Sequence, residues 1–108
     1  RFIRMKKKRY QNKKHLMWVS EQPCCLSAHF PALCEGYIQA HHLLKPFEGF
    51  RGVGLRANDK NVIPLCYKHH YLLHKRGNEF AYFKEATGDE LFGQQIAKYL
   101  WENSPHDK

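Results

Sequence analysis

The chain has 108 residues and a formal net charge of +8, and hydrophobic residues make up 43% of it. One domain is expected at this length, and the apolar content excludes a chain that is disordered by composition. No apolar run approaches the roughly 18 residues of a membrane span, and no signal-peptide pattern opens the chain. We therefore expect a cytoplasmic protein with no membrane partner.

The excess positive charge lies in the first 14 residues, which hold eight of the 18 Lys and Arg residues and no acid. From Glu21 onward, ten basic and ten acidic residues balance. A block of like charge cannot fold on itself but can neutralise the phosphates of a nucleic acid. We expect this arm to contact DNA through Lys6, Lys7, Lys8 and Arg9. A solvated tail is the plainer alternative.

The first half of the chain predicts one helix and one strand. Residues 10–22 have helical character, with residues 16–19 available to pack, and Pro23 ends the helix. An irregular knuckle over residues 24–36 closes on a glycine turn, and residues 37–44 have strand character.

After a glycine-bearing loop over residues 45–60, residues 61–65 predict a second short strand. Residues 67–76 predict a helix that Gly77 stops, because glycine readily adopts the left-handed backbone that ends helices. The histidine-rich middle of the chain is therefore spread over strand, loop, strand and helix.

Two further helices are expected at the end of the chain. Asn78 would cap the first, which carries Phe80 and Phe83 and stops at Gly88. Asp89 would cap the second. Its apolar stripe is formed by Phe92, Ile96, Tyr99 and Leu100.

Four cysteines, interleaved with six histidines between positions 29 and 74, favour zinc over disulfides in a chain without a secretory signal. A structural zinc needs four ligands, usually as two close pairs. Cys66 and His69 form one pair at the start of a helix. The other pair comes from three cysteines of the knuckle: Cys24, Cys25 and Cys34. His29 is a further candidate ligand, and four buried free thiols are the plainer alternative.

Hydrolysis of a phosphodiester with one metal ion needs a base that activates water, a cation that stabilises the phosphate, and a group that holds the base. His41 and His42 are neighbours on a strand, so one can bind metal while the other faces the water on the opposite side. On the next helix, His70 and His74 share a face, whereas His69 is rotated by about 100°. This helix can therefore serve two metals.

These stretches resemble the HNH endonuclease signature of the ββα-metal, or His-Me finger, fold. The resemblance rests on Ala-His-His at 40–42, Asn61-Val-Ile-Pro-Leu-Cys66 and Cys-Tyr-Lys-His-His at 66–70. More narrowly, Gly52-Val-Gly54, Asp59 and Pro-Leu-Cys-x-x-His-His-x-x-x-His at 64–74 resemble HNH proteins of phages and prophages, including the Ref-like recombination-enhancing nucleases. The resemblance as a whole covers about residues 23–88.

The resemblance implies an α+β fold, with a ββα-metal core, a zinc knuckle, and flanking N- and C-terminal helices. Within a single domain, we expect a basic N-terminal arm and helix (1–22), the HNH core with its zinc knuckle (23–77) and a C-terminal helical extension (78–108).

In the phage subgroup a Pro-Cys pair opens the knuckle, and Pro23-Cys24 matches it. The implied zinc ligands are Cys24, Cys34, Cys66 and His69, with Cys25 as the alternative to Cys24. The spacing departs from the tight Cys-x-x-Cys of such families, because Ser27 stands where the second cysteine would fall.

The resemblance also implies the catalytic roles. His42 would be the general base, His41 and His70 ligands of a catalytic divalent ion, and His74 a further ligand or a phosphate contact. Asn61 would tie the hairpin loop through side-chain hydrogen bonds and so orient the base.

Asp59 is the rival of Asn61, because an acid recurs at this position in the phage subgroup. It would share or replace the role of Asn61. The plainer alternative is a turn residue in Ala-Asn-Asp-Lys, where Asn58 fits equally well.

The sequence therefore predicts a metal-dependent DNA endonuclease of phage or prophage origin in a bacterial host. Mg²⁺ is the expected catalytic ion, although a histidine site also accepts Zn²⁺, Ni²⁺ or Mn²⁺. Four more basic residues would contact the DNA backbone: Lys45, Arg51, Arg56 and Lys68. The alternative is a zinc-stabilised nucleic-acid-binding module without turnover, acting in recombination or packaging with a recombinase or packaging partner left unidentified.

Overall fold

The computed structural model of the chain describes residues 10–30, 33–47 and 57–106, which contain four helices and a two-stranded sheet. The elements in chain order are α1 (Lys13–Ser20), β1 (Ile38–His42), β2 (Val62–Cys66), α2 (Tyr67–Arg76), α3 (Glu79–Thr87) and α4 (Phe92–Asn103). The expected α+β class is confirmed. Among the described helices, none has the length and apolar character needed to cross a membrane.

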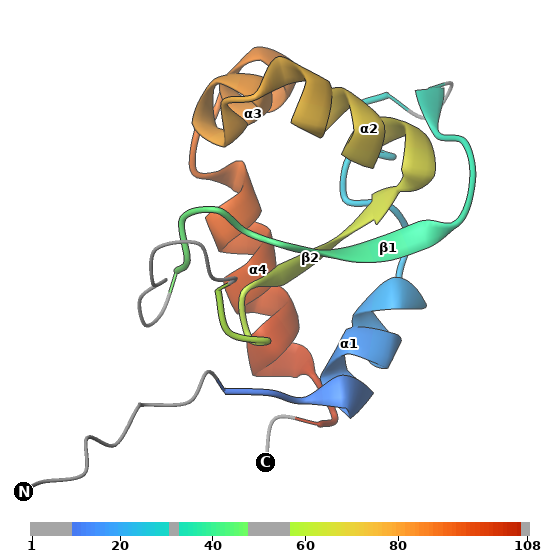
Figure 1. Ribbon diagram of the computed structural model, residues 1–108, viewed down its shortest axis with the longest axis vertical. Helices are drawn as coiled ribbons and strands as arrows, with labels where there is room; N and C mark the ends of the chain where they lie inside the picture. The colour runs from blue at the N-terminus through green and yellow to red at the C-terminus, as the bar shows by residue number, and fades with distance from the viewer. Residues whose placement is uncertain (1–9, 31–32, 48–56, 107–108) are drawn as a thin grey trace, which may run out of the picture.

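The strands β1 and β2 form an antiparallel hairpin that crosses the middle of the molecule (Figure 1). The register pairs Ile38 with Cys66 and His42 with Val62. Every residue of β2 is buried, and α2 follows it without a break. The sulfur of Cys66 caps α2 by accepting a hydrogen bond from the backbone N–H of His69. A single junction therefore joins the sheet to the helix that carries three histidines.

The first helix is shorter than the expected 10–22. Its start is set by Asn12, whose side chain accepts a hydrogen bond from the backbone N–H of His15, and it ends at Ser20, before Pro23 is reached. Of the residues expected to pack, Val19 is fully buried but Met17 is 63% exposed, because the helix turns it away from the sheet.

The ends of α2 and α3 are as the sequence indicates. Gly77 and Gly88 follow the two helices with φ angles of 81° and 86°, in the left-handed region that favours glycine. The Asn78 side chain caps α3 by accepting from the backbone N–H of Ala81, at 3.0 Å. Phe83 of α3 is fully buried.

The expected N-terminal cap of α4 and its expected apolar stripe were partly wrong. Asp89 does not cap this helix: Leu91 occupies the N-cap, and the Asp89 carboxylate instead accepts from the Leu91 backbone N–H at 2.8 Å. Tyr99 is 63% exposed, whereas Gly93 and Ala97 are buried. Gly93 brings α4 close to the core, where an added Cβ would lie 3.0 Å from side-chain carbons of Leu43 and Phe83. This close approach sets the rotation of the helix.

The main core lies between the hairpin and helices α2 to α4. Its fully buried side chains are Leu26, Leu43, Ile63, Leu65, Phe83 and Ala97. A smaller cluster of Val19, Val62 and Leu100 joins α1, β2 and α4. The two clusters hold both faces of β2, so the hairpin and the start of α2 are fixed on both sides.

Candidate metal centres

A group of three cysteines and one histidine, here called the cysteine group, lies where the knuckle meets the β2–α2 junction. Cys24, Cys34, Cys66 and His69 each offer one ligand atom, and these atoms all lie within 4.8 Å of one another. Cys66 ends β2 and His69 lies in the first turn of α2. The other two sulfurs come from the knuckle.

The spacing of the cysteine group is that of a tetrahedral metal site. The Nδ1 atom of His69 lies 3.5 Å from Cys24 Sγ, 3.7 Å from Cys34 Sγ and 3.2 Å from Cys66 Sγ. Around a zinc ion with bonds of ~2.3 Å to sulfur and ~2.0 Å to nitrogen, a tetrahedron separates these atoms by about 3.5 Å. The group could therefore hold a metal ion such as zinc.

The electrostatics of the cysteine group favour a bound cation. Burial, and then the charge of Cys24, raises the pKa of the Cys34 thiol to about 12. Burial is the largest influence on the pKa of Cys66 and acts to raise it, but hydrogen bonds together outweigh burial and lower that pKa. They come from the backbone at His69 and Glu35 and from the thiols of Cys24 and Cys34. Crowded thiolates repel one another, and a divalent cation among them removes this cost.

The structure places Cys24, and not its neighbour Cys25, in the cysteine group. The backbone N–H of Cys25 donates to the Pro64 carbonyl at 2.8 Å, and burial raises the pKa of its thiol well above the ordinary value. His29 is exposed and lies outside the group, with its ring edge-on to Phe92 at a centroid distance of 5.6 Å.

A second group, here called the histidine group, consists of His41 of β1 with His70 and His74 of α2. His70 Nε2 lies 3.1 Å from His41 Nδ1 and 3.0 Å from His74 Nε2. An octahedral ion with bonds of ~2.1 Å separates adjacent ligand atoms by about 3.0 Å. These three nitrogen atoms could therefore hold a second metal ion.

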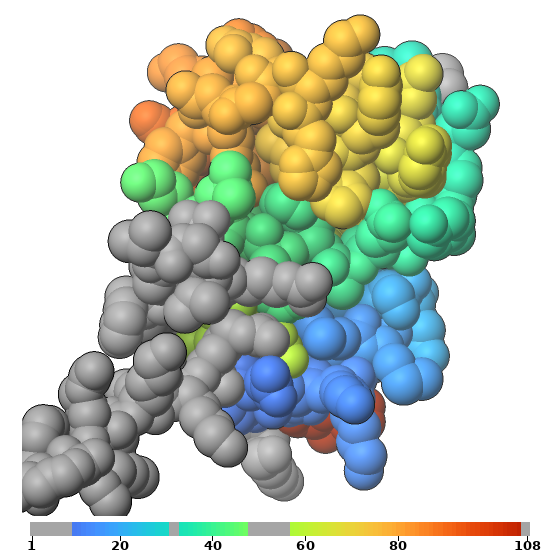
Figure 2. All heavy atoms as spheres, in the orientation of Figure 1, coloured from blue at the N-terminus to red at the C-terminus, as the bar shows by residue number. Residues whose placement is uncertain are grey.

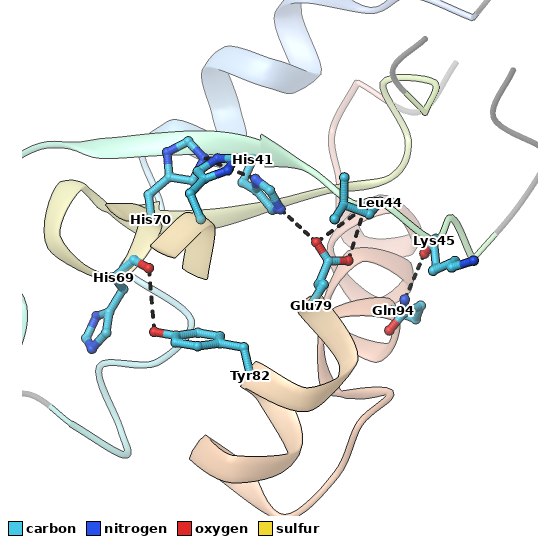
Figure 3. A network of polar contacts seen from close by, with 9 residues as sticks. His41, Leu44, Lys45, His69, His70, Glu79, Tyr82 and Gln94 are labelled. Atoms are coloured by element: carbon cyan, nitrogen blue, oxygen red, sulfur yellow. Dashed lines mark hydrogen bonds and ion pairs between the residues drawn. The ribbon is translucent and has the colours of Figure 1, made fainter. Parts of the chain in front are cut away.

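The hydrogen-bond partners of the His41 and His70 rings indicate which of their nitrogen atoms carry protons. His41 Nε2 lies 2.9 Å from the Glu79 carboxylate (Figure 3). His70 Nδ1 lies against the side-chain oxygen of Gln39. Both oxygens only accept, so both of these ring nitrogens donate. When both rings are neutral, His41 Nδ1 and His70 Nε2 then face each other as two lone pairs. Two facing lone pairs repel, and a shared cation reverses this.

His70 stays neutral in this arrangement. Burial, followed by repulsion from the protonated forms of His41 and His74, lowers the pKa of His70 to about 4. At neutral pH its Nε2 atom therefore keeps the lone pair that a metal ion needs.

Glu79 is a member of this site that the sequence did not indicate. It is the first residue of α3, is 4% exposed, and accepts hydrogen bonds from His41 Nε2 and from the Leu44 backbone N–H at 3.1 Å (Figure 3). An acid in the first turn of a helix is ordinary, so its sequence position carries no special signal. Only the packing of α3 against the hairpin brings it to His41.

His42 points to the other side of β1, as neighbours on a strand do. Its Nε2 atom lies 2.8 Å from Asp59 Oδ1, and Asp59 Oδ2 accepts from the Asn12 backbone N–H at 2.8 Å. The structure thus brings His42 to Asp59 and not into the histidine group. Asp59 is 3% exposed, which is unlike a simple turn residue.

Asn61 has a different task from Asp59. It is fully buried, and its side-chain oxygen accepts from the Phe47 backbone N–H at 2.7 Å. Its side-chain nitrogen donates to Asn58 Oδ1 at 2.8 Å. Asn61 therefore ties the two ends of the loop between the strands, while Asp59 holds the histidine.

Two of the basic residues expected to contact DNA lie in the described part of the chain. Lys45 is exposed, and Lys68 is half-buried on α2. The others lie outside the described residues: Lys6, Lys7, Lys8, Arg9, Arg51 and Arg56.

Comparison with known proteins gives a family and a relative. Residues 1–98 match the family described as "Protein of unknown function (DUF968)". The chain is similar to "Uncharacterized protein YdfU" of Escherichia coli (strain K12), with 35% identity over 86 residues. The match covers 80% of this chain and 22% of YdfU, so the chain spans about a fifth of that relative. No solved structure matches.

Proposed function

We propose that this chain, which belongs to the DUF968 family, is a metal-dependent DNA endonuclease with the ββα-metal core of HNH nucleases. The observation that carries the proposal is the close group of histidine nitrogens, in which His41 Nδ1 and His70 Nε2 lie 3.1 Å apart beside His74. Strand β1 supplies His41 and helix α2 supplies His70 and His74, which is the order that the HNH resemblance implies.

The cysteine group would be a structural zinc site. Its four ligands would complete a tetrahedron around the ion, which would leave no position for a substrate or water. By holding the knuckle against Cys66 and His69, it would fix the start of α2 and hence the direction of His70 and His74.

The histidine group would hold the catalytic divalent ion, with Mg²⁺ as the expected ion. When bound, such an ion supplies positive charge for the scissile phosphate and the leaving oxygen. The protein supplies three imidazoles, and Glu79 fixes the tautomer of His41 from behind.

His42 would be the general base, oriented by Asp59. The Asp59 carboxylate accepts a hydrogen bond from His42 Nε2, which would make Nδ1 the nitrogen that takes a proton from water. The carboxylate also stabilises the imidazolium that forms when water gives up its proton. Asn61 would support the pair by tying the loop that carries Asp59.

Cleavage of plasmid DNA by the purified, zinc-loaded chain tests this proposal. With Mg²⁺ or Mn²⁺ present, we expect nicked or linear product. His42→Ala should slow cleavage by about 10²–10⁴-fold, the range for loss of a general base. His70→Ala should do the same by removing a metal ligand, and both variants should keep their zinc.

The matched control is His29→Ala, since His29 is an exposed histidine outside both groups. It should cut at the rate of the unchanged protein. Equal cleavage by His42→Ala or His70→Ala would overturn the assigned roles. Tight DNA binding without cleavage in Mg²⁺, Mn²⁺, Ni²⁺ and Zn²⁺ would overturn the nuclease proposal in favour of a binding module.

A further inference from the structure

Three exposed tyrosines, here called the tyrosine ridge, stand beside the histidine group. Tyr37, Tyr67 and Tyr71 are 67%, 51% and 51% exposed. The Tyr37 and Tyr67 ring centroids lie 6.2 Å apart, with their planes inclined by 33°. Tyr71 follows Tyr67 by one turn of α2, so it lies on the same side of the helix. In Figure 2 the yellow atoms of α2 and the green atoms leading into β1 meet at the surface.

Helical phase places the tyrosines directly next to the metal-binding histidines. At 100° per residue, six side chains of α2 follow one another over an arc of about 160°. Their order around the helix is His70, His74, Tyr67, Tyr71, Lys75 and Lys68. The buried His69 and Leu73 lie on the opposite side. The helix contains no acid, so this arc is either neutral or positive along its whole width.

The ridge is built into the fold. Gly36, with a φ of 85°, lies so close to Tyr67 that an added Cβ would come within 2.6 Å of the Tyr67 Cβ. Only glycine fits there, and the next residue is Tyr37. Gln39 donates from its side-chain nitrogen to the Tyr37 hydroxyl at 3.2 Å, while its oxygen accepts from His70 Nδ1. One side chain therefore links the ridge to the histidine group.

Positive charge borders the ridge on the side away from the histidines. Lys75 Nζ lies 6.0 Å from the centroid of the Tyr71 ring. Arg76 is turned elsewhere and pairs with Glu85 at 2.9 Å. Aromatic faces flanked by lysines suit a strand of nucleic acid, whose bases stack on the rings while its phosphates meet the cations.

We propose that the tyrosine ridge stacks the unpaired bases of a DNA strand whose phosphate lies at the histidine group. This inference rests on the proposed function and adds to it a substrate class, single-stranded or locally unpaired DNA. A continuous duplex hides the faces of its bases and gives the tyrosines nothing to stack on. Stacking on aromatic rings tolerates any base, so no sequence preference is expected from the ridge.

Binding in the absence of a catalytic ion tests the inference separately from cleavage. Fluorescence anisotropy of the zinc-loaded chain would be measured with four labelled ligands of equal length: oligo-dT, the same strand with abasic sites, a DNA duplex, and oligo-U. Oligo-dT should bind most tightly. Tyr67→Ser and Tyr71→Ser should each weaken oligo-dT binding about tenfold, and leave abasic and duplex binding unchanged.

Two controls guard against a loss of folding. Tyr67→Phe keeps the aromatic face and should bind like the unchanged protein. Tyr99→Ser removes a tyrosine that is 63% exposed on α4, away from the ridge, and should have no effect. Unchanged oligo-dT binding by Tyr67→Ser and Tyr71→Ser, or an equal loss for the abasic strand, would overturn the inference. Tighter binding of oligo-U than of oligo-dT would overturn the assignment to DNA.

The outcomes also separate this inference from the proposed function. If the chain never cuts DNA but its tyrosine variants lose oligo-dT binding, the inference about the tyrosine ridge is supported and the nuclease proposal is overturned. If the chain cuts DNA and its tyrosine variants bind oligo-dT normally, the nuclease proposal is supported and the inference about the tyrosine ridge is overturned.

Discussion

The cysteine group has four ligand atoms on buried or half-buried residues, whereas the histidine group has three, and its His74 is exposed. A metal with four protein ligands has no place for a reactant, but one with three ligands keeps open positions. Both groups use α2, about 100° apart around its axis, because His69 and His70 are neighbours. The comparison shows how one short helix can contribute to a buried group of ligand atoms and to a second group that reaches the surface.

The largest effect is expected when a ligand is removed from the cysteine group. Cys66→Ser should abolish zinc binding and unfold the chain, because a structural zinc contributes about 10–16 kcal/mol and a whole domain has a net stability of about 5–15 kcal/mol. Circular dichroism and zinc analysis would measure both effects. Cys25→Ser is the matched control and should keep its zinc. A Cys66→Ser protein that melts normally would contradict a structural role.

A smaller effect is expected when the partner of the general base His42 is changed and the residues of both metal groups are kept. Asp59→Asn should slow DNA cleavage by about a hundredfold, because an amide can no longer stabilise the charged form of His42. The zinc content and the affinity for Mn²⁺ should stay the same. A fall in Mn²⁺ affinity equal to the fall in rate would show that Asp59 acts on the metal and not on the base.

Glu79→Gln tests the histidine group, because Glu79 holds the ring of His41. Outer partners of a metal-bound histidine tune affinity by about 10–100-fold, and the amide retains one accepting oxygen, so we expect a loss near tenfold. Titration calorimetry with Mn²⁺ would measure it, and the zinc content should not change. Unaltered Mn²⁺ affinity would remove Glu79 from the site.

The smallest effect is a pH dependence of the zinc-loaded chain without a catalytic ion. His70 keeps a neutral ring down to its pKa of about 4, whereas in the unfolded chain it takes up a proton near pH 6.5. The unfolded state binds more protons between these values, so the free energy of unfolding should fall as the pH falls from about 6.5 to 4. His70→Gln should weaken this slope in urea titrations. An identical slope in both proteins would contradict the lowered pKa.

Much of the fold and of both groups could be predicted because it depends on local rules. The bounds of α2, the glycine stops, and the separation of His69 from His70 all follow from helical period and capping. Glu79 and the contact of Asp59 with Asn12 could not be predicted, because they join segments distant in sequence. The phase of α4 depends on how closely Gly93 approaches the core, and the sequence pattern of the helix does not contain that distance.

The sulfur of Cys66 caps α2, and three ligands follow it at fixed steps along the helix: His69 of the cysteine group, and His70 and His74 of the histidine group. This makes the spacing between Cys66 and His69 intolerant of length changes. One residue inserted there would rotate His69, His70 and His74 together by about 100° relative to the hairpin. Both groups would be lost in a single event. Homologous chains should therefore differ by substitution in this segment and almost never by insertion or deletion.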